Sequence, residues 1–245
     1  MATSASINGP IEPVQSSSRL IAPAWHTLLL LVVMLGLSFA GANREHHALT
    51  HSQRVIMYIV TMASEWIVVA FVFWGIHRHK KITLRDLIGG KWSKPEDFLL
   101  DLAIAAGFLF VSMIVLGGLG YAFGLTKNHA DAQKLAFLAP RSTLEVLLWF
   151  GVSATAGFCE EVIYRGYFQR QITAWTNLAW VGLVMQGVLF GFSHGYEGAI
   201  RMFLIAIFGT MFGLVAHWRK SLRPGMLTHA GYDIIAGLAL RVIAK

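Results

Sequence analysis

The sequence contains little charge and almost no cysteine. Only 13% of its 245 residues are charged, whereas soluble domains carry about 25%. So few charged side chains could not cover the surface of a soluble globular protein, which excludes that class. The single cysteine, Cys159, excludes an intrachain disulfide and every CxxC motif. Hydrophobic residues make up 56% of the chain, and this composition indicates a polytopic membrane protein.

Several catalytic and binding motifs are also missing. The sequence has no HExxH, the metal-binding motif of the ordinary zinc peptidases. It has no Gly-x-Ser-x-Gly and no Cys–His dyad signature. No motif for DNA or RNA recognition accompanies the net charge of +7. The basic residues are scattered between apolar runs, which favours loops that face an anionic membrane surface over a nucleic-acid site.

Seven apolar runs are long enough to cross a membrane as helices, because about 20 residues span its hydrocarbon core. The runs lie at about 25–42, 55–76, 98–124, 143–164, 174–193, 199–217 and 225–243. The fourth is expected to be longer, because its apolar pattern continues to Phe168. The alternation of a β-barrel is absent. The sequence therefore predicts an all-α, polytopic integral membrane helix bundle with about seven to eight transmembrane helices.

The chain divides into three parts. Residues 1–23, rich in Ser, Pro and Ala, predict a disordered N-terminal tail, and residues 24–142 predict transmembrane helices without a catalytic motif. Residues 143–243 predict a catalytic membrane domain. Basic residues, above all those at 77–81, lie mainly on the side of the N-terminus, which favours a cytoplasmic N-terminus. The short chain and its minimal loops indicate a protein of a prokaryotic cytoplasmic membrane.

Charged side chains gather at one place within the apolar spans. A charge in the middle of the bilayer costs about 2.5–3.5 kcal/mol, yet Glu160, Glu161 and Arg165 stand together in the fourth run. Glu161 and Arg165 are four residues apart and can pair on one helix face. Glu160 points about 100° away and is free of that pair. A helix end at the membrane surface, with the arginine reaching the headgroups, is the alternative.

Two histidines lie in later apolar runs. His194 follows Phe190 by four residues at the end of the fifth run, and His229 precedes Asp233 by four residues in the last run. Each motif alone also fits a capped helix end or a structural pair. A glutamate with two histidines in hydrophobic helices is typical of a general base that activates water, or of a metal site.

The order Glu160-Glu161-x-x-x-Arg165, Phe190-x-x-x-His194 and His229-x-x-x-Asp233 resembles the CPBP intramembrane proteases. This family includes the type II CAAX prenyl endopeptidases and the abortive-infection proteins. The resemblance covers residues ~143–240. It implies an intramembrane endopeptidase that depends on a glutamate and was historically classed as a metalloprotease.

The resemblance also implies roles for the individual residues. Glu160 is similar to the glutamate that activates the attacking water, and His194 to the histidine that binds this water. His229 is similar to the histidine that stabilises the oxyanion. Glu161 and Arg165 resemble the pair that positions Glu160. Phe190, the aromatic residue of the second motif, is expected to support the site structurally.

Asp233 departs from the pattern, because many members of the family have Asn there. An amide donates a hydrogen bond to an oxyanion and an ionised carboxylate cannot. Asp233 therefore either holds His229 protonated or donates as a neutral acid. No cofactor is assigned; a divalent metal such as zinc is the alternative, with Glu160, His194 and His229 as its ligands. The expected partners are the lipid bilayer and a membrane-anchored peptide or prenylated protein substrate, without nucleic acid.

Three other functions fit the same residues. A catalytically silent membrane scaffold or immunity-type protein would keep the motifs without the activity. A proton or ion transporter could use an acidic relay composed of Glu65, Asp101, Glu160, His194, His229 and Asp233. A structural metal or haem site would use the two histidines. Hydrolysis within a membrane also needs a long or tilted fourth helix, or a half-buried fifth one, to bring Glu160 and His194 to one depth.

Overall fold

The computed structural model describes residues 20–42, 48–125 and 135–243. Within these ranges the chain is helical and has no β-strand, as the sequence predicts. The helices are α1 (Ala24–Ala42), α2 (His51–Lys80), α3 (Leu84–Ile88), α4 (Pro95–Ala122), α6 (Thr143–Glu160), the π-helix η1 (Glu161–Phe168), α7 (Gln169–Thr176), α8 (Ala179–Ser193), the 3-10 turn η2 (Gly195–Glu197), α9 (Ala199–Arg219) and α10 (Arg223–Ile243).

Six helices of the described chain are long and apolar enough to cross a membrane. The fourth of them is continuous from Thr143 to Thr176, through α6, η1 and α7, so the expected extension of the fourth run is present. The fifth run differs from the expectation of a full span. Its helix α8 has 15 residues, about 22 Å at 1.5 Å per residue, against a hydrocarbon core of about 30 Å.

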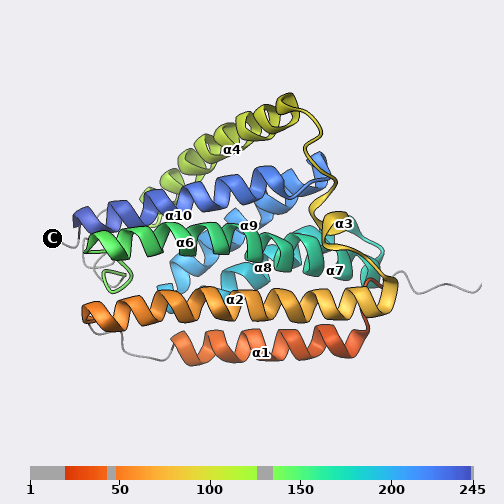
Figure 1. Ribbon diagram of the computed structural model, residues 1–245, viewed down its shortest axis with the longest axis horizontal. Helices are drawn as coiled ribbons and strands as arrows, with labels where there is room; N and C mark the ends of the chain where they lie inside the picture. Colours follow the sequence, from red (N-terminus) through yellow and green to blue (C-terminus); the bar gives the residue numbers. More distant parts are fainter. Residues whose placement is uncertain (1–19, 43–47, 126–134, 244–245) are drawn as a thin grey trace, which may run out of the picture.

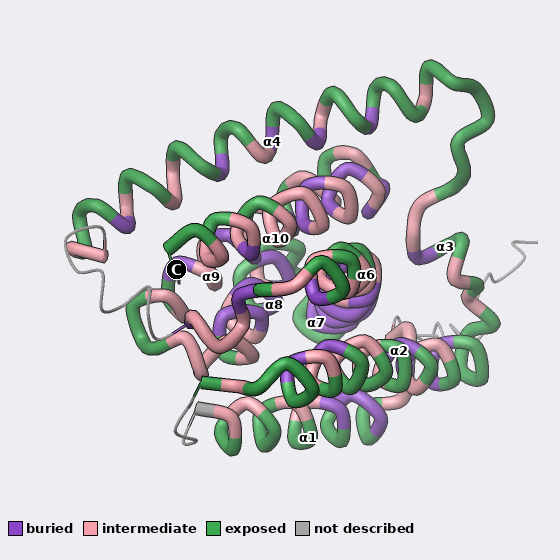
Figure 2. The backbone as a smooth tube through the Cα atoms, turned by 60° about the vertical axis from the view of Figure 1, so that its left-hand side comes forward, coloured by how far each residue is buried: buried purple, intermediate pink, exposed green. Residues whose placement is uncertain are grey.

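The long helix α6–η1–α7 lies at the centre of the bundle. Figure 1 shows α2 and α10 on either side of it, with α1 beyond α2 and α4 beyond α10. In Figure 2 the buried residues, in purple, are concentrated on this central helix and its neighbours. Most of α4 is exposed and is drawn in green. An exposed apolar surface is what a helix that faces lipid presents. The charged residues of α6 and η1 are therefore enclosed by other helices.

One end of the bundle collects basic residues and tryptophans, and we call it the basic end. It contains the start of α1, the segment from α2 to α4, the turn between α7 and α8, and the turn between α9 and α10 (Figure 1). Exposed tryptophans surround it: Trp25, Trp74, Trp92, Trp175, Trp180 and Trp218. Tryptophans concentrate where a membrane meets water. The loops that the sequence placed on the side of the N-terminus thus lie at one end of the bundle.

Small residues bring α8 and α9 together. A Cβ at Gly187 would lie 2.7 Å from the carbonyl oxygen of Ala206, and one at Gly209 would lie 3.0 Å from the Cα of Gly187. These two helices share a closer approach than larger side chains would permit, as is common for helices in lipid. This contact holds the short helix α8 in place although it cannot span the membrane.

The start of the described chain is fixed to the central helix. Of the tail expected at 1–23, residues 1–19 lie outside the described residues. The amides of Ile21 and Ala22 donate to Gln171 Oε1, at 2.9 and 3.2 Å. In α1, His26 Nδ1 and Thr27 Oγ1 lie 2.8 and 2.7 Å from the hydroxyl of Tyr167. These contacts hold α1 and the residues before it against η1 and α7.

Candidate active site

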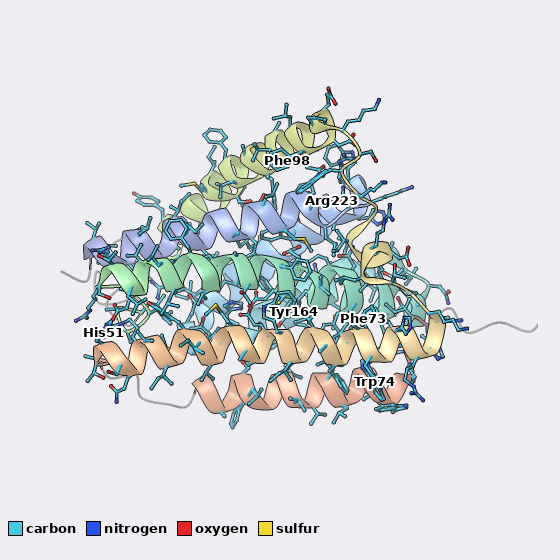
Figure 3. The ribbon with its side chains drawn as sticks, viewed as in Figure 1. His51, Phe73, Trp74, Phe98, Tyr164 and Arg223 are labelled. Carbon is cyan, nitrogen blue, oxygen red and sulfur yellow. The ribbon has the colours of Figure 1, made fainter. Side chains whose placement is uncertain are left out.

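Glu160 is the last residue of α6 and stands directly before the π-helix η1. The amide of Gln169 donates to the carbonyl of Tyr164, which is the five-residue hydrogen bond of a π-helix. Every residue of η1 is buried. Segments of this kind are rare and frequently lie at functional sites. Figure 3 shows Tyr164, a residue of η1, in the middle part of the bundle, away from His51 at one end. Glu160 therefore lies well away from both ends of the bundle.

Glu161 and Arg165 form a fully buried ion pair within η1. Arg165 Nη1 donates to Glu161 Oε1 at 2.8 Å, and Nη2 donates to the carbonyl of Gly209 at 3.0 Å. The guanidinium carbon lies 4.5 Å from the ring centroid of Phe190 and 4.7 Å from that of Phe212. The structure thus contains the pair that the four-residue spacing indicates, with Phe190 packed against it. This pair fixes the helix immediately after Glu160.

His229 of α10 lies between the two glutamates. Its Nδ1 is 3.2 Å from Glu161 Oε1, and its Nε2 is 3.5 Å from Glu160 Oε2. The same Nε2 is 3.7 Å from Asp233 Oδ2. The side chain of His229 is 5% exposed, and those of Glu160 and Asp233 are 19% and 28% exposed. One imidazole therefore faces three carboxylates, two of which are partly accessible.

The close approach of α6 and α10 brings these groups together. A Cβ at Gly157 would lie 2.8 Å from the carbonyl oxygen of Met226 and 2.9 Å from the amide nitrogen of Ala230. Any side chain larger than hydrogen would push α10 away at this point. Trp149 Nε1 also donates to the carbonyl of Asp233 at 2.9 Å. The glycine permits the contact, and the indole fixes the register of the two helices.

His194 lies beside this group rather than within it. It ends α8, and its Nδ1 lies 2.9 Å from the carbonyl oxygen of Phe190. The ring of Phe190 stands 4.9 Å from the ring of His194 and 5.7 Å from that of His229. Electrostatic interactions of His194 reach Asp233. The structure thus gathers Glu160, His229 and Asp233 closely and joins His194 to them through an aromatic ring.

Glu65 of α2 is a further carboxylate beside Glu160, to which the sequence pattern assigned no catalytic role. Its neighbour Trp66 stacks on Phe158 of α6 with ring centroids 5.3 Å apart. Glu65 Oε2 is buried and has no hydrogen-bond partner among the described residues. Electrostatic interactions of Glu65 reach Glu160 and His229. The site is therefore lined by α2 as well as by the motif-bearing helices.

A signal for Glu65 was present in the spacing of α2. Tyr58, Val69, Val72 and Ile76 are buried on one face of this helix, and Glu65 falls on the same face at three- and four-residue intervals. A carboxylate on the buried stripe of a membrane helix needs an explanation. The spacing of buried residues does not identify the helix that this face contacts. The structure shows that the face packs against α6.

The zinc alternative names Glu160, His194 and His229 as ligands. No group of three or more His, Cys, Asp or Glu side chains in the described part of the chain could hold a metal ion. A zinc site brings its ligands to about 2.0–2.3 Å from the ion. Both ring nitrogens of His229 instead face carboxylates, and His194 Nδ1 faces a carbonyl. The structure records other neighbours for these nitrogens, and the zinc alternative stays a prediction.

A known family model matches the segment that contains the site. Residues 142–235 match the model of the family described as type II CAAX prenyl endopeptidase Rce1-like. The match includes all the residues of the three motifs, from Glu160 to Asp233, and leaves out α1, α2 and α4. No curated protein and no solved structure matches the chain. The match confirms the resemblance found in the sequence for residues 142–235 of this integral membrane protein.

Proposed function

We propose that the protein is an intramembrane endopeptidase that hydrolyses a peptide bond of a membrane-anchored substrate, with Glu160 as the general base. The observation that carries this proposal is an unsatisfied carboxylate oxygen of Glu160. Its Oε2 atom is buried and has no hydrogen-bond partner among the described residues, although it lies 3.5 Å from His229 Nε2. A buried carboxylate oxygen needs a donor, and a water molecule supplies one.

The proposed reaction uses the side chains of Glu160, His229 and His194. Glu160 accepts a proton from the water, and the resulting hydroxide attacks the carbonyl carbon of the scissile peptide bond. The N–H of His229 stabilises the negative charge that develops on the carbonyl oxygen. Glu160 then transfers its proton to the nitrogen of the leaving amine as the C–N bond breaks. His194, which ends α8, is assigned to hold the water.

Asp233 and Glu161 act on His229 rather than on the substrate. Glu161 lies at Nδ1 and Asp233 lies near Nε2. Negative charge on both sides of an imidazole favours the imidazolium, which is a stronger donor to an oxyanion than the neutral ring. This supports the role of Asp233 as the group that keeps His229 charged, in place of an amide that donates directly.

The substrate class is proposed from the family and from the depth of the site. Glu160 lies near the middle of a 34-residue helix that crosses the bundle. A substrate reaches such a site most readily when it is itself held in the membrane. A prenylated C-terminal CAAX peptide meets this condition and is named in the description of the matching family.

The test is cleavage of a farnesylated CAAX peptide by the detergent-purified full chain, followed by mass spectrometry. Wild type is expected to release the last three residues, and Glu160→Gln is expected to be about 10²–10⁴-fold slower, the range for a lost general base. Glu96→Gln is the matched control, because Glu96 is exposed at the start of α4. A strong chelator in a parallel reaction tests metal dependence.

The outcomes separate the alternatives. Cleavage that persists in Glu160→Gln, or equal loss in Glu160→Gln and Glu96→Gln, contradicts the assignment of the base. Absence of cleavage by wild type contradicts the CAAX substrate. In that case, a scan of other membrane-anchored peptides distinguishes a different protease substrate from a silent scaffold.

A further inference from the structure

The last turn of α8 directs a backbone carbonyl at the ring of His194. The amide of His194 donates to the carbonyl of Gly191 at 3.0 Å, which leaves the carbonyl of Phe190 without this amide. The last carbonyls of a helix need partners from outside its regular hydrogen-bond pattern. The Phe190 carbonyl has two such partners, His194 Nδ1 at 2.9 Å and Ser193 Oγ at 2.7 Å. Since Ser193 Oγ also lies 3.2 Å from His194 Nδ1, the three groups form one hydrogen-bonded cluster.

These contacts determine which nitrogen of His194 carries a proton. A carbonyl oxygen only accepts hydrogen bonds, so Nδ1 is the donor in its 2.9 Å contact with Phe190. His229 has carboxylates at both of its ring nitrogens, whereas the groups in contact with His194 Nδ1 are a carbonyl and a hydroxyl. Uncharged neighbours favour the neutral ring over the imidazolium. A neutral ring with its proton on Nδ1 has a lone pair on Nε2.

Nε2 of His194 is the ring nitrogen that remains available to a ligand. It has no hydrogen-bond partner among the described residues, and the side chain is half-buried. The ring is restrained by aromatic neighbours, because its centroid lies 4.9 Å from that of Phe190 and 6.0 Å from that of Tyr196. A lone pair in this position accepts a hydrogen bond from water.

A serine that donates to the backbone of its own helix is common, and Ser64 of α2 is an example in this chain. Its Oγ donates to the carbonyl of Thr61 at 2.8 Å, over the same three-residue interval as the bond from Ser193 to Phe190. Ser64 is exposed. Ser193 differs because its acceptor is shared with an imidazole, and this shared acceptor links the serine to the candidate site.

We propose that Ser193 is a positioning residue: with the carbonyl of Phe190 it holds the neutral ring of His194 with its proton on Nδ1, so that Nε2 accepts a hydrogen bond from the attacking water. This inference rests on the proposed peptidase function. One hydrogen of the water then faces Glu160 and the other faces Nε2. When Glu160 takes its proton, the hydroxide keeps the other hydrogen bonded to Nε2, and an oxygen lone pair attacks the carbonyl carbon.

The structural test is nuclear magnetic resonance of the detergent-purified full chain with ¹⁵N-labelled histidine. The signals of His194 are identified by their loss in His194→Gln. Wild type is expected to carry the proton on Nδ1. Ser193→Ala is expected to add a second set of ring signals, because one of the two groups that fix the ring is gone. Ser193→Thr keeps a hydroxyl that can donate to the helix backbone, and it is expected to match wild type, as is the control Ser64→Ala.

The kinetic test is cleavage of the farnesylated CAAX peptide by the same variants. Ser193→Ala is expected to lower kcat about two- to tenfold, the equivalent of one neutral hydrogen bond. KM should stay within about twofold of wild type, because Ser193 acts through His194 and not on the substrate. Ser193→Thr should restore most of the lost kcat, and Ser64→Ala should match wild type. A purely structural role would lower the folded fraction and leave kcat per folded molecule unchanged.

The outcomes separate this inference from the peptidase function. A proton on Nε2 in neutral His194 of wild type, or an unchanged kcat in Ser193→Ala, overturns the inference. Equal loss of kcat in Ser193→Ala and Ser64→Ala overturns it as well, because the effect would not depend on the contact with His194. If wild type cleaves no peptide, the peptidase function fails and the resonance data decide alone. Unchanged ring signals in Ser193→Ala then overturn the positioning role, and a second set supports it.

Discussion

The acidic side chains inside the bundle fall into two groups, and the first group is fully paired. Asp101 of α4 accepts from Arg219 Nε at 3.0 Å and from Trp92 Nε1 at 2.8 Å. Glu145 of α6 accepts from Arg54 Nη1 at 3.2 Å, and its other oxygen accepts from backbone amides at the start of the helix. Both residues lie near an end of the bundle. Each links helices that are distant in sequence.

The second group lies midway along the bundle and is incompletely paired. Glu65, Glu160 and Glu161 each have one buried oxygen without a hydrogen-bond partner among the described residues. Buried polar atoms are normally satisfied, and exceptions often mark a functional site. The difference separates Asp101 and Glu145, whose oxygens are committed to the fold, from Glu65 and Glu160. Glu161 has features of both groups, because its Oε1 accepts from Arg165 while its Oε2 has no described partner. The difference also weakens the proton-relay alternative, because both oxygens of Asp101 are committed to the first group.

Removal of the arginine from the buried pair is expected to have the largest effect on folding. Arg165→Met breaks the buried pair and leaves Glu161 with only His229 Nδ1 beside its Oε1 in an enclosed site, and breaking such a pair costs about 3–5 kcal/mol. The free energy of unfolding, measured by titration with denaturing detergent, should fall by this amount. The double variant with Glu161→Gln should recover part of the loss, because the uncompensated charge is gone. A loss below about 1 kcal/mol in the single variant would contradict the burial of the pair.

A substitution of Glu145, which belongs to the fully paired group, should lower the free energy of unfolding and leave peptidase activity unchanged. Glu145→Gln weakens the hydrogen bonds to Arg54 and to the amide of Ser142, and we expect a loss of about 1.5–3 kcal/mol in the free energy of unfolding. Peptidase activity per folded molecule should stay within about twofold of wild type. A large loss of activity in folded Glu145→Gln would show that the two groups of acids are not separate.

The opposite result is expected at Glu65. Glu65→Gln removes no hydrogen bond of the described structure but replaces a carboxyl group that interacts with Glu160, and interactions between neighbouring groups are worth about 0.5–3 kcal/mol. We expect about a tenfold loss of kcat, with the free energy of unfolding within about 0.5 kcal/mol of wild type. Glu96→Gln is again the control. Unchanged kcat would assign Glu65 to neither group.

The smallest effect is expected at Asp233. Asp233→Asn keeps the shape of the side chain, and Glu161 still faces the other ring nitrogen of His229. Activity in the peptide assay should stay within about threefold of wild type. A loss as large as that of Glu160→Gln would exclude both a neutral donor and a simple orienting role for Asp233.

The sequence predicted those parts of the fold that depend on short-range pattern. Apolar run length was enough to place the membrane helices, and the apolar residues up to Phe168 correctly indicated an extended fourth helix. The short length of α8 was not predicted, because the apolar run at 174–193 continues across the break at Asn177, which has φ 58°. The π-helix η1 was not predicted either, since its residues have no pattern that distinguishes them from an α-helix.

The candidate site was predicted from motifs rather than from geometry. Four-residue spacing was sufficient for the pair of Glu161 and Arg165, which lie on one helix. The contact of His229 with both glutamates depends on how α6 and α10 pack, and Gly157 reveals that packing only once α10 is seen against it. Glu65 shows the same limit, because helical spacing gives the face of a residue and not its neighbour.

The short helix α8 makes the site sensitive to the lipid around it. Because α8 covers only part of a bilayer of ordinary thickness, the turn η2 and His194 at its end lie below one membrane surface unless the lipid thins there. Lipids adapt to such hydrophobic mismatch at a modest cost per ångström. Longer acyl chains would bury the end of α8 more deeply and lengthen the path of water to His194. We therefore expect the rate of the proposed hydrolysis to depend on the acyl-chain length of the host membrane.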